Sequence, residues 1–67
     1  MPMTMKAARV NAGIRQEEAA NSIGIAPSTL SKWENGRAYP NALQLSALCK
    51  IYNISMDDII FLQTQST

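Results

Sequence analysis

Apolar side chains recur along this chain at the three- and four-residue spacing of helices, and turn residues divide the pattern into five short segments. No stretch keeps the strict apolar–polar alternation of a half-buried strand, and the β-branched residues are scattered. The pattern therefore predicts an all-α fold of five helices in a single domain over residues 1–67, with a polar tail at 63–67.

The first predicted helix runs from Thr4 to Ala12. Thr4 is a suitable N-cap, because its side-chain oxygen can accept a hydrogen bond from a free N–H of the first turn. Gly13 can take the left-handed conformation that often ends a helix. The apolar stripe of this helix would consist of Met5, Ala8 and Ala12.

Two further helices follow, joined by a tight turn at Gly24. The earlier one spans Gln16 to Ile23, and the later one opens at Pro27, which suits a first helical position because the N–H there is unpaired anyway. The later helix ends at Asn35-Gly36. The predicted buried positions of the pair are Ala19, Ala20, Ile23, Leu30 and Trp33. Two helices joined in this way form a helix-turn-helix, here at about residues 16–35, whose second helix can lie in the DNA major groove.

Asn41 is the predicted cap of a fourth helix that ends at Asn53. Its apolar positions are Ala42, Leu45, Leu48, Cys49 and Tyr52. A fifth helix is predicted to open at Ser55 as N-cap, with Asp58 where a capping box carries its acid. The apolar positions of that last helix are Met56, Ile59, Ile60 and Leu62.

Composition excludes several kinds of chemistry. One cysteine allows no disulfide within the chain, and the absence of histidine removes the usual zinc-ligand sets. No nucleophile–base pair is recognisable, so we expect no enzyme activity, no metal and no cofactor. No apolar run approaches membrane-spanning length, and the N-terminal residues lack the apolar segment of a signal peptide, so we expect a cytoplasmic protein without a membrane partner.

The net charge of +1 is low for a protein that binds nucleic acid. Distribution matters more than the sum, because Arg9, Arg15, Lys32 and Arg37 can gather on one face. Two acids, Glu17 and Glu18, fall in the first turn of a predicted helix, where a carboxylate is favourable.

The chain resembles the lambda-repressor-like, or Cro/C1-type, helix-turn-helix family, also called the XRE family. The resemblance covers about Met5 to Leu62. The matching residues are Gly13-Ile14, Gln16-Glu17-Glu18, Gly24-Ile25, Ser28-Thr29-Leu30-Ser31-Lys32-Trp33-Glu34-Asn35-Gly36, Pro40, Leu45, Leu48 and Ile54-Ser55-Met56-Asp57-Asp58-Ile59-Ile60. It implies a compact five-helix domain that binds double-stranded DNA, usually as a homodimer.

The resemblance also assigns base-contacting positions to the start of the second helix of the pair and to the residue one turn later. Lys32 is the best reader, because a lysine can donate to guanine O6 and N7. Ser28 is less selective, Pro27 offers only an apolar contact, and Thr29 would reach a base edge or a phosphate. The alternative for Lys32 is an ordinary solvated surface lysine.

Phosphate contacts are implied at the start of the second predicted helix and in the loop after the third. Gln16 would use its backbone N–H at a helix N-terminus. The other candidates are Arg9, Arg15, Asn35, Arg37 and Tyr39. Family members often pair a basic residue of the first helix with the acid at Glu34, so we predict an Arg9–Glu34 salt bridge that is structural and also positions Arg9 near the phosphate backbone.

Three alanines depart from the family pattern. Ala8 and Ala19 stand where leucine is usual, which predicts a thin core between the first two helices. Ala26 occupies the usual Ser or Thr cap, a loss of about 1 kcal/mol that the fixed φ of Pro27 partly offsets. A marginally stable domain is expected.

Several side chains have two interpretations. Trp33 is expected in the core rather than stacked on a base, and Cys49 as a small buried hydrophobe rather than a redox switch. The C-terminal apolar residues either fold back on their own core or form a two-fold interface; the interface candidates are Ile59, Ile60, Phe61 and Leu62.

The leading function is a transcriptional regulator, most simply a repressor whose dimer occupies a palindromic operator. The alternative is a protein-interaction module, such as an antitoxin-type protein, whose main partner is another protein.

Overall fold

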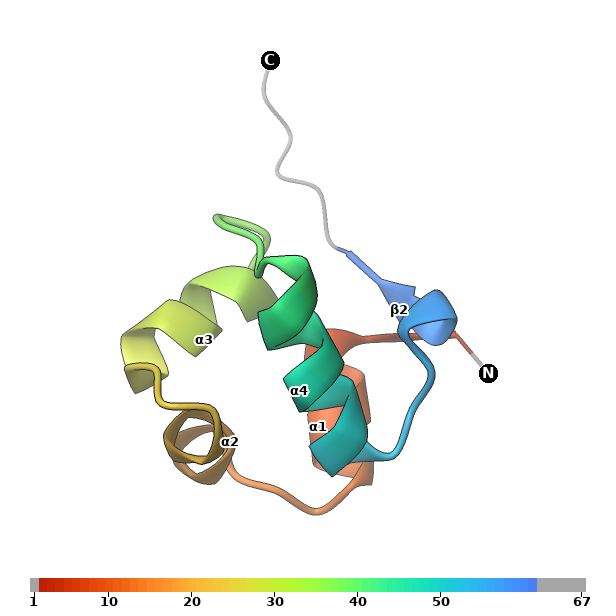
Figure 1. The fold of residues 1–67 in the computed structure, drawn as a ribbon, viewed down its shortest axis with the longest axis horizontal. Coiled ribbons are helices and arrows are strands. Elements are labelled where there is room, and N and C mark those ends of the chain that lie inside the picture. The colour runs from red at the N-terminus through yellow and green to blue at the C-terminus, as the bar shows by residue number, and fades with distance from the viewer. Residues whose placement is uncertain (1, 62–67) are drawn as a thin grey trace.

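The computed structural model describes residues 2–61, which fold into four short α-helices, one 3-10 turn and two two-residue strands (Figure 1). In chain order the elements are β1 (Met3–Thr4), α1 (Met5–Asn11), α2 (Gln16–Ser22), α3 (Pro27–Glu34), α4 (Ala42–Tyr52), the 3-10 turn η1 (Met56–Asp58) and β2 (Ile59–Ile60). Four of the five predicted helices are therefore present. The polar tail at 63–67 lies outside the described residues.

The capping residues place the ends of α1 close to the prediction. The Thr4 hydroxyl oxygen accepts a hydrogen bond from the Ala7 N–H at 3.1 Å, and Gly13 follows the helix with φ +74°. Met5 and Ala8 are buried as predicted, but Ala12 is exposed. The third buried residue of α1 is Arg9, because it lies four residues after Met5 on the inward face of the helix.

The turn between α2 and α3 is the predicted one. Gly24 has φ +75°, a conformation that costs glycine little and other residues more. Pro27 occupies the first turn of α3, and Ala26 caps that helix without any side-chain hydrogen bond. The predicted core positions of the two helices are buried except for Ile23, which is half-buried at the end of α2.

A full capping box opens α4. The Asn41 side chain accepts from the Gln44 N–H at 2.8 Å, and the Gln44 side chain accepts from the Asn41 N–H at 2.9 Å. Asn53 ends the helix in the left-handed conformation, with φ 56°. Of the predicted apolar stripe, Leu45 is half-buried and Ala42 is exposed, so the stripe begins later than expected.

The predicted fifth helix is wrong. Ser55 does cap a helical segment, accepting from the Asp57 N–H at 3.3 Å, but that segment is the single turn η1. The chain then becomes extended and β2 pairs in parallel with β1, Met3 opposite Ile59 and Thr4 opposite Ile60. Consecutive isoleucines favour extended backbone because branching at Cβ restricts χ1. The prediction of no strands is corrected by this pair.

The core lies where α1 meets α3 and α4, with α2 packed on α3. Figure 1 shows α1 behind α4, β2 on one side of that pair, and α2 and α3 on the other. The buried cluster consists of Met5, Ala8, Ala19, Ala20, Leu30, Trp33, Leu48 and Tyr52. None of the helices within residues 2–61 is long and apolar enough to cross a membrane.

Candidate nucleic-acid interface

The outer face of α3 presents the predicted base readers to solvent. Pro27, Ser28 and Lys32 are exposed, whereas Thr29 is half-buried. Leu30 and Trp33 face the core from the opposite side, which fixes the rotation of the helix. Trp33 is 4% exposed, so the core placement predicted for it is confirmed.

Asn35 and Ser31 form a side-chain contact on the same face that sequence reasoning missed. The Asn35 Nδ2 donates to the Ser31 carbonyl oxygen at 2.9 Å and is 3.3 Å from the Ser31 hydroxyl oxygen. The four-residue spacing of Ser31 and Asn35 could have predicted this contact, since residues four apart on a helix are neighbours. Asn35 is exposed, and this contact holds its amide beside the helix rather than free in solvent.

A buried ion pair fastens the inner side of α3 to α1, as predicted. The Arg9 Nε lies 2.8 Å from the Glu34 Oε2, and the Arg9 Nη2 donates to Oε1 at 3.3 Å. The third guanidinium nitrogen, Nη1, donates to the Ile14 carbonyl oxygen at 2.9 Å in the loop before α2. Arg9 is only 9% exposed, so its guanidinium acts inside the fold.

Gln16 reaches the same carboxylate from the start of α2. Its Nε2 donates to the Glu34 Oε1 at 3.0 Å. Glu34 thus accepts hydrogen bonds from side chains of α1 and α2, and the three helices are joined at one buried carboxylate. No local pattern indicated this contact, because Gln16 and Glu34 are 18 residues apart. The side chain of Gln16 is engaged internally, which leaves its backbone N–H as the group suited to an anion.

Two exposed arginines lie at the start of α2 and in the loop after α3. Arg15 is largely solvent-exposed and lies 3.3 Å from the Glu18 carboxylate, and hydrogen bonds from the Arg15 backbone N–H and side chain lower the pKa of Glu18. Arg37 is exposed, and its backbone N–H donates to the Lys32 carbonyl oxygen at 2.9 Å. With Gly36 at φ +73°, this bond forms the C-terminal cap of α3 and brings the backbones of Lys32 and Arg37 together.

The C-terminal apolar residues do not all lie on one surface. Ile59 packs against the core, whereas Ile60 is 47% exposed. Phe61 makes an edge-to-face contact with Tyr39, with ring centroids 5.6 Å apart. Tyr39 is therefore turned toward the C-terminal segment. Leu62 lies outside the described residues.

Cys49 is buried, as expected of a small hydrophobe, and burial raises the pKa of its thiol. That shift opposes formation of a thiolate at neutral pH.

Known proteins resemble this chain over most of its length. A helix-turn-helix family model matches residues 5–59. The HTH-type transcriptional activator BcrR of Enterococcus faecalis is 29% identical over 52 residues, which are 78% of this chain and 26% of BcrR. The uncharacterized HTH-type transcriptional regulator YgzD of Bacillus subtilis is 26% identical over 66 residues, 98% of this chain and 100% of YgzD. The chain thus spans about a quarter of one relative and all of the other. No solved structure matches significantly.

Proposed function

The chain belongs to the helix-turn-helix family, and we propose that it is a sequence-specific regulator of transcription that binds double-stranded DNA with α3 in the major groove. One observation carries the proposal. The outer face of α3 exposes Pro27, Ser28 and Lys32, while Glu34 on the same helix is held from inside by Arg9 and Gln16. The face proposed to contact bases therefore lies on a helix that α1 and α2 hold in place.

Base readout rests mainly on Lys32. Its ammonium group can donate to guanine O6 and N7, which identifies a G·C pair. Ser28 can donate to or accept from several bases and so discriminates less. Pro27 contributes an apolar contact, for example to a thymine methyl group, and the half-buried Thr29 reaches a base or phosphate from the flank.

Phosphate contacts set the register of the domain on the duplex. We assign them to the Arg15 and Arg37 side chains and to the backbone N–H of Gln16. Asn35 and Tyr39 are further candidates, the first through its amide and the second through its hydroxyl group. Arg9 supports these contacts from inside, because its bond to the Ile14 carbonyl oxygen fixes the loop that leads into α2.

The simplest regulatory mode is repression by a dimer on a palindromic operator. Two copies related by a two-fold axis would place their α3 helices about 34 Å apart, in successive major grooves. Occupancy alone would then exclude polymerase. The names of the relatives support regulation in general, since one is an activator and the other a regulator.

Selection of bound sequences from a random duplex library tests the proposal, with Lys32→Ala run in parallel. We expect a palindrome with half-sites about 10 base pairs apart, and relaxation at one position per half-site in the variant, where discrimination falls by about 1–3 kcal/mol. Lys6→Ala is the matched control, because Lys6 is an exposed lysine on α1 and should leave the selected sequence unchanged.

A protein-interaction module is the second candidate, favoured by exposed apolar side chains outside α3 such as Leu43 and Met56. Failure to enrich any sequence at low salt would contradict DNA recognition by this chain and favour that second function. Retained, unaltered selectivity in Lys32→Ala would contradict only the role assigned to Lys32.

A further inference from the structure

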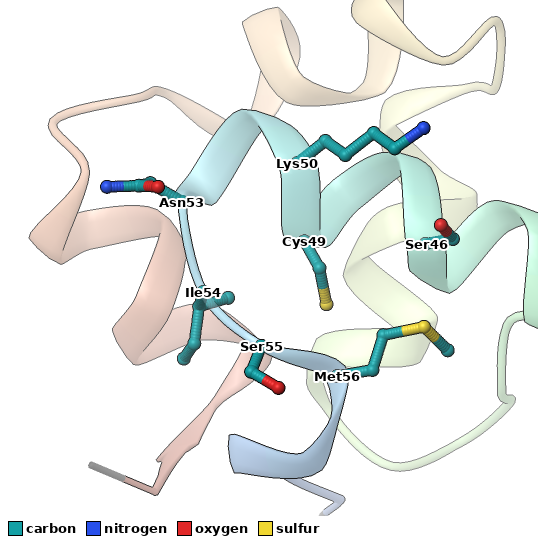
Figure 2. Close-up of a pocket in the computed structure, with 7 residues that line it drawn as sticks. All are labelled: Ser46, Cys49, Lys50, Asn53, Ile54, Ser55 and Met56. Carbon is teal, nitrogen blue, oxygen red and sulfur yellow. The ribbon is translucent and has the colours of Figure 1, made fainter.

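The chain reverses direction after α4 and returns along that helix. Asn53 ends α4 in the left-handed conformation, with φ 56°. Figure 2 shows the residues that follow, Ile54, Ser55 and Met56, running back beside the C-terminal half of α4. The chain then passes through η1 into β2, which is held in place by its pairing with β1. The residue after β2, Phe61, is thereby brought near the opposite end of α4, where the loop from α3 enters that helix.

The alternation of an extended chain directs Phe61 toward the body of the protein. Ile59 packs against the core and Ile60 is 47% exposed, as expected because successive side chains of a strand point to opposite sides. Continuation of this alternation places Phe61 on the side of Ile59. There its ring meets the ring of Tyr39, with centroids 5.6 Å apart and planes at 80°. Aromatic pairs prefer this edge-to-face arrangement over a face-to-face stack.

The loop of residues 37–40, between α3 and α4, is fastened at both ends. The Arg37 N–H donates to a carbonyl oxygen of α3 at 2.9 Å, and the capping box of α4 fixes the other end. Ala38 packs against the core. Tyr39, by contrast, is 53% exposed, and Phe61 packs on its ring. The aromatic contact therefore steadies the outer part of a loop whose inner part is already held.

We propose that Phe61 is a positioning residue for DNA binding, which holds Tyr39 and thereby keeps the loop of residues 37–40 in the form that presents Arg37 to a phosphate group. This role rests on the proposed function and gives the segment after β2 a part in it. Figure 1 shows β2 and α3 on opposite sides of α4, so the aromatic contact ties a segment outside the helix-turn-helix to the loop that follows α3.

The physical basis of this role is order in the free protein. A loop that is ordered before binding loses less conformational freedom when its side chains contact DNA, and the affinity is correspondingly higher. Phosphate contacts carry no sequence information directly. Loss of the Phe61 ring should therefore weaken binding and leave the preferred base sequence unchanged.

Fluorescence anisotropy with a duplex that carries one half-site tests this role, because binding of one copy requires no interface between two copies. Phe61→Leu removes the ring and keeps a large apolar side chain. We expect it to weaken binding about two- to tenfold, the range that corresponds to one aromatic pair. The slope of log K against log salt concentration should become shallower by up to about 0.9, the contribution of one phosphate.

Two further variants separate positioning from a general loss of stability. Phe61→Tyr keeps the ring and should retain the affinity of the wild type. Met56→Leu is the matched control, since Met56 is an apolar side chain of similar exposure in the same C-terminal segment, 41% against 37% for Phe61, and it should also bind as the wild type does. Thermal unfolding verifies that every variant is folded at the temperature of the assay.

A double-mutant cycle with Arg37→Ala tests whether Phe61 acts through the loop. If it does, Phe61→Leu should weaken the affinity of Arg37→Ala by a smaller factor than it weakens the affinity of the wild type, because the two changes act on the same contact. Equal factors in the two backgrounds would overturn the proposal, as would a Phe61→Leu variant that binds the half-site as tightly as the wild type.

Measurements without DNA distinguish a failure of this role from a failure of the proposed function. Backbone ¹⁵N relaxation should give lower order parameters for the amides of residues 37–39 in Phe61→Leu than in the wild type or in Phe61→Tyr. Unchanged order parameters would overturn the role of Phe61 and leave DNA recognition intact. A wild type that binds no duplex would overturn the proposed function and this role together, even if the loop loses order in Phe61→Leu.

Discussion

Glu34 links three helices through one buried carboxylate. Its oxygens accept hydrogen bonds from Arg9 and Gln16, and its side chain is 3% exposed. Burying two charges is costly, so the pair need not stabilise the fold more than apolar residues of similar shape would. Removal of one partner is a different matter, because it leaves the other charge buried without compensation.

We expect Glu34→Gln to lower the free energy of unfolding by about 3 kcal/mol, as measured by urea denaturation. The double variant Arg9→Met/Glu34→Leu removes both charges and should recover much of that loss. Glu18→Gln breaks the exposed pair with Arg15 and should have a far smaller effect. An unchanged midpoint in Glu34→Gln would show that the buried pair contributes little.

Tyr52 gives a prediction at high pH. Its hydroxyl is buried without a hydrogen-bond partner among the described residues, and burial, followed by the nearby Glu34 carboxylate, raises its pKa to about 12. The unfolded chain therefore loses this proton at lower pH than the folded chain does. The contribution of Tyr52 to the free energy of unfolding is therefore fully present below about pH 10. It falls by about 2 kcal/mol as the pH rises toward 12.

Tyr52→Phe should abolish that alkaline loss and should cost little at neutral pH, because it removes a buried hydroxyl that has no hydrogen-bond partner within residues 2–61. Denaturation of both proteins at pH 7 and pH 11 is the measurement. If the free energy of unfolding falls from pH 7 to pH 11 by the same amount in the variant as in the wild type, the alkaline effect does not come from Tyr52.

At the scale of elements, the helices differ in how their first turns are capped. Thr4 and Asn41 cap α1 and α4 with side-chain oxygens, but Ala26 gives α3 no such bond. Its backbone already has the extended conformation of a cap, with φ −73° and ψ 145°. A serine at this position can therefore accept from the first turn without any rearrangement of the backbone.

We expect Ala26→Ser to raise the free energy of unfolding by about 1 kcal/mol and Thr4→Ala to lower it by a similar amount. Thermal unfolding of the two variants beside the wild type provides the measurement. A loss of stability in Ala26→Ser would mean that the serine side chain makes no cap there.

At the scale of the whole molecule, ion pairs with acidic side chains limit how many basic side chains are available to contact DNA. The chain has six basic and five acidic side chains, and the interior Arg9–Glu34 pair removes one of each from the surface. Near α3 this leaves Arg15, Lys32 and Arg37, the first of them shared with Glu18.

We therefore predict weak salt dependence of DNA binding. The slope of log K against log salt concentration should be about −2 to −3 per chain, because each phosphate neutralised contributes about −0.9. Fluorescence anisotropy across salt concentrations would measure it. Arg37→Ala should make the slope shallower by about 1, and Lys6→Ala on α1 should not change it. A much steeper slope would require additional phosphate contacts.

Features that depend on neighbours along the chain were predictable from the residues alone. Thr4, Asn41 and Asn53 mark helix ends because caps and left-handed conformations act within one turn. The spacing of Leu30 and Trp33 fixed the inward side of α3, and with it the outward position of Ser28 and Lys32. The Arg9–Glu34 pair was predicted from family resemblance and not from local pattern.

Features that join distant segments depend on how the helices and strands pack together. Ile59 and Ile60 were predicted to be helical because they lie three and four residues after the apolar Met56. They pair instead with Met3 and Thr4, more than 50 residues away. This pairing provides hydrogen-bond partners for backbone groups, and such distant partners cannot be identified from the local pattern. In the same way, Gln16 reaches Glu34 because α2 packs on α3. The hollow between the C-terminal half of α4 and the segment 54–56 likewise exists only because that segment returns beside the helix. Local periodicity specifies which side of an element is apolar, whereas packing specifies which distant groups meet there.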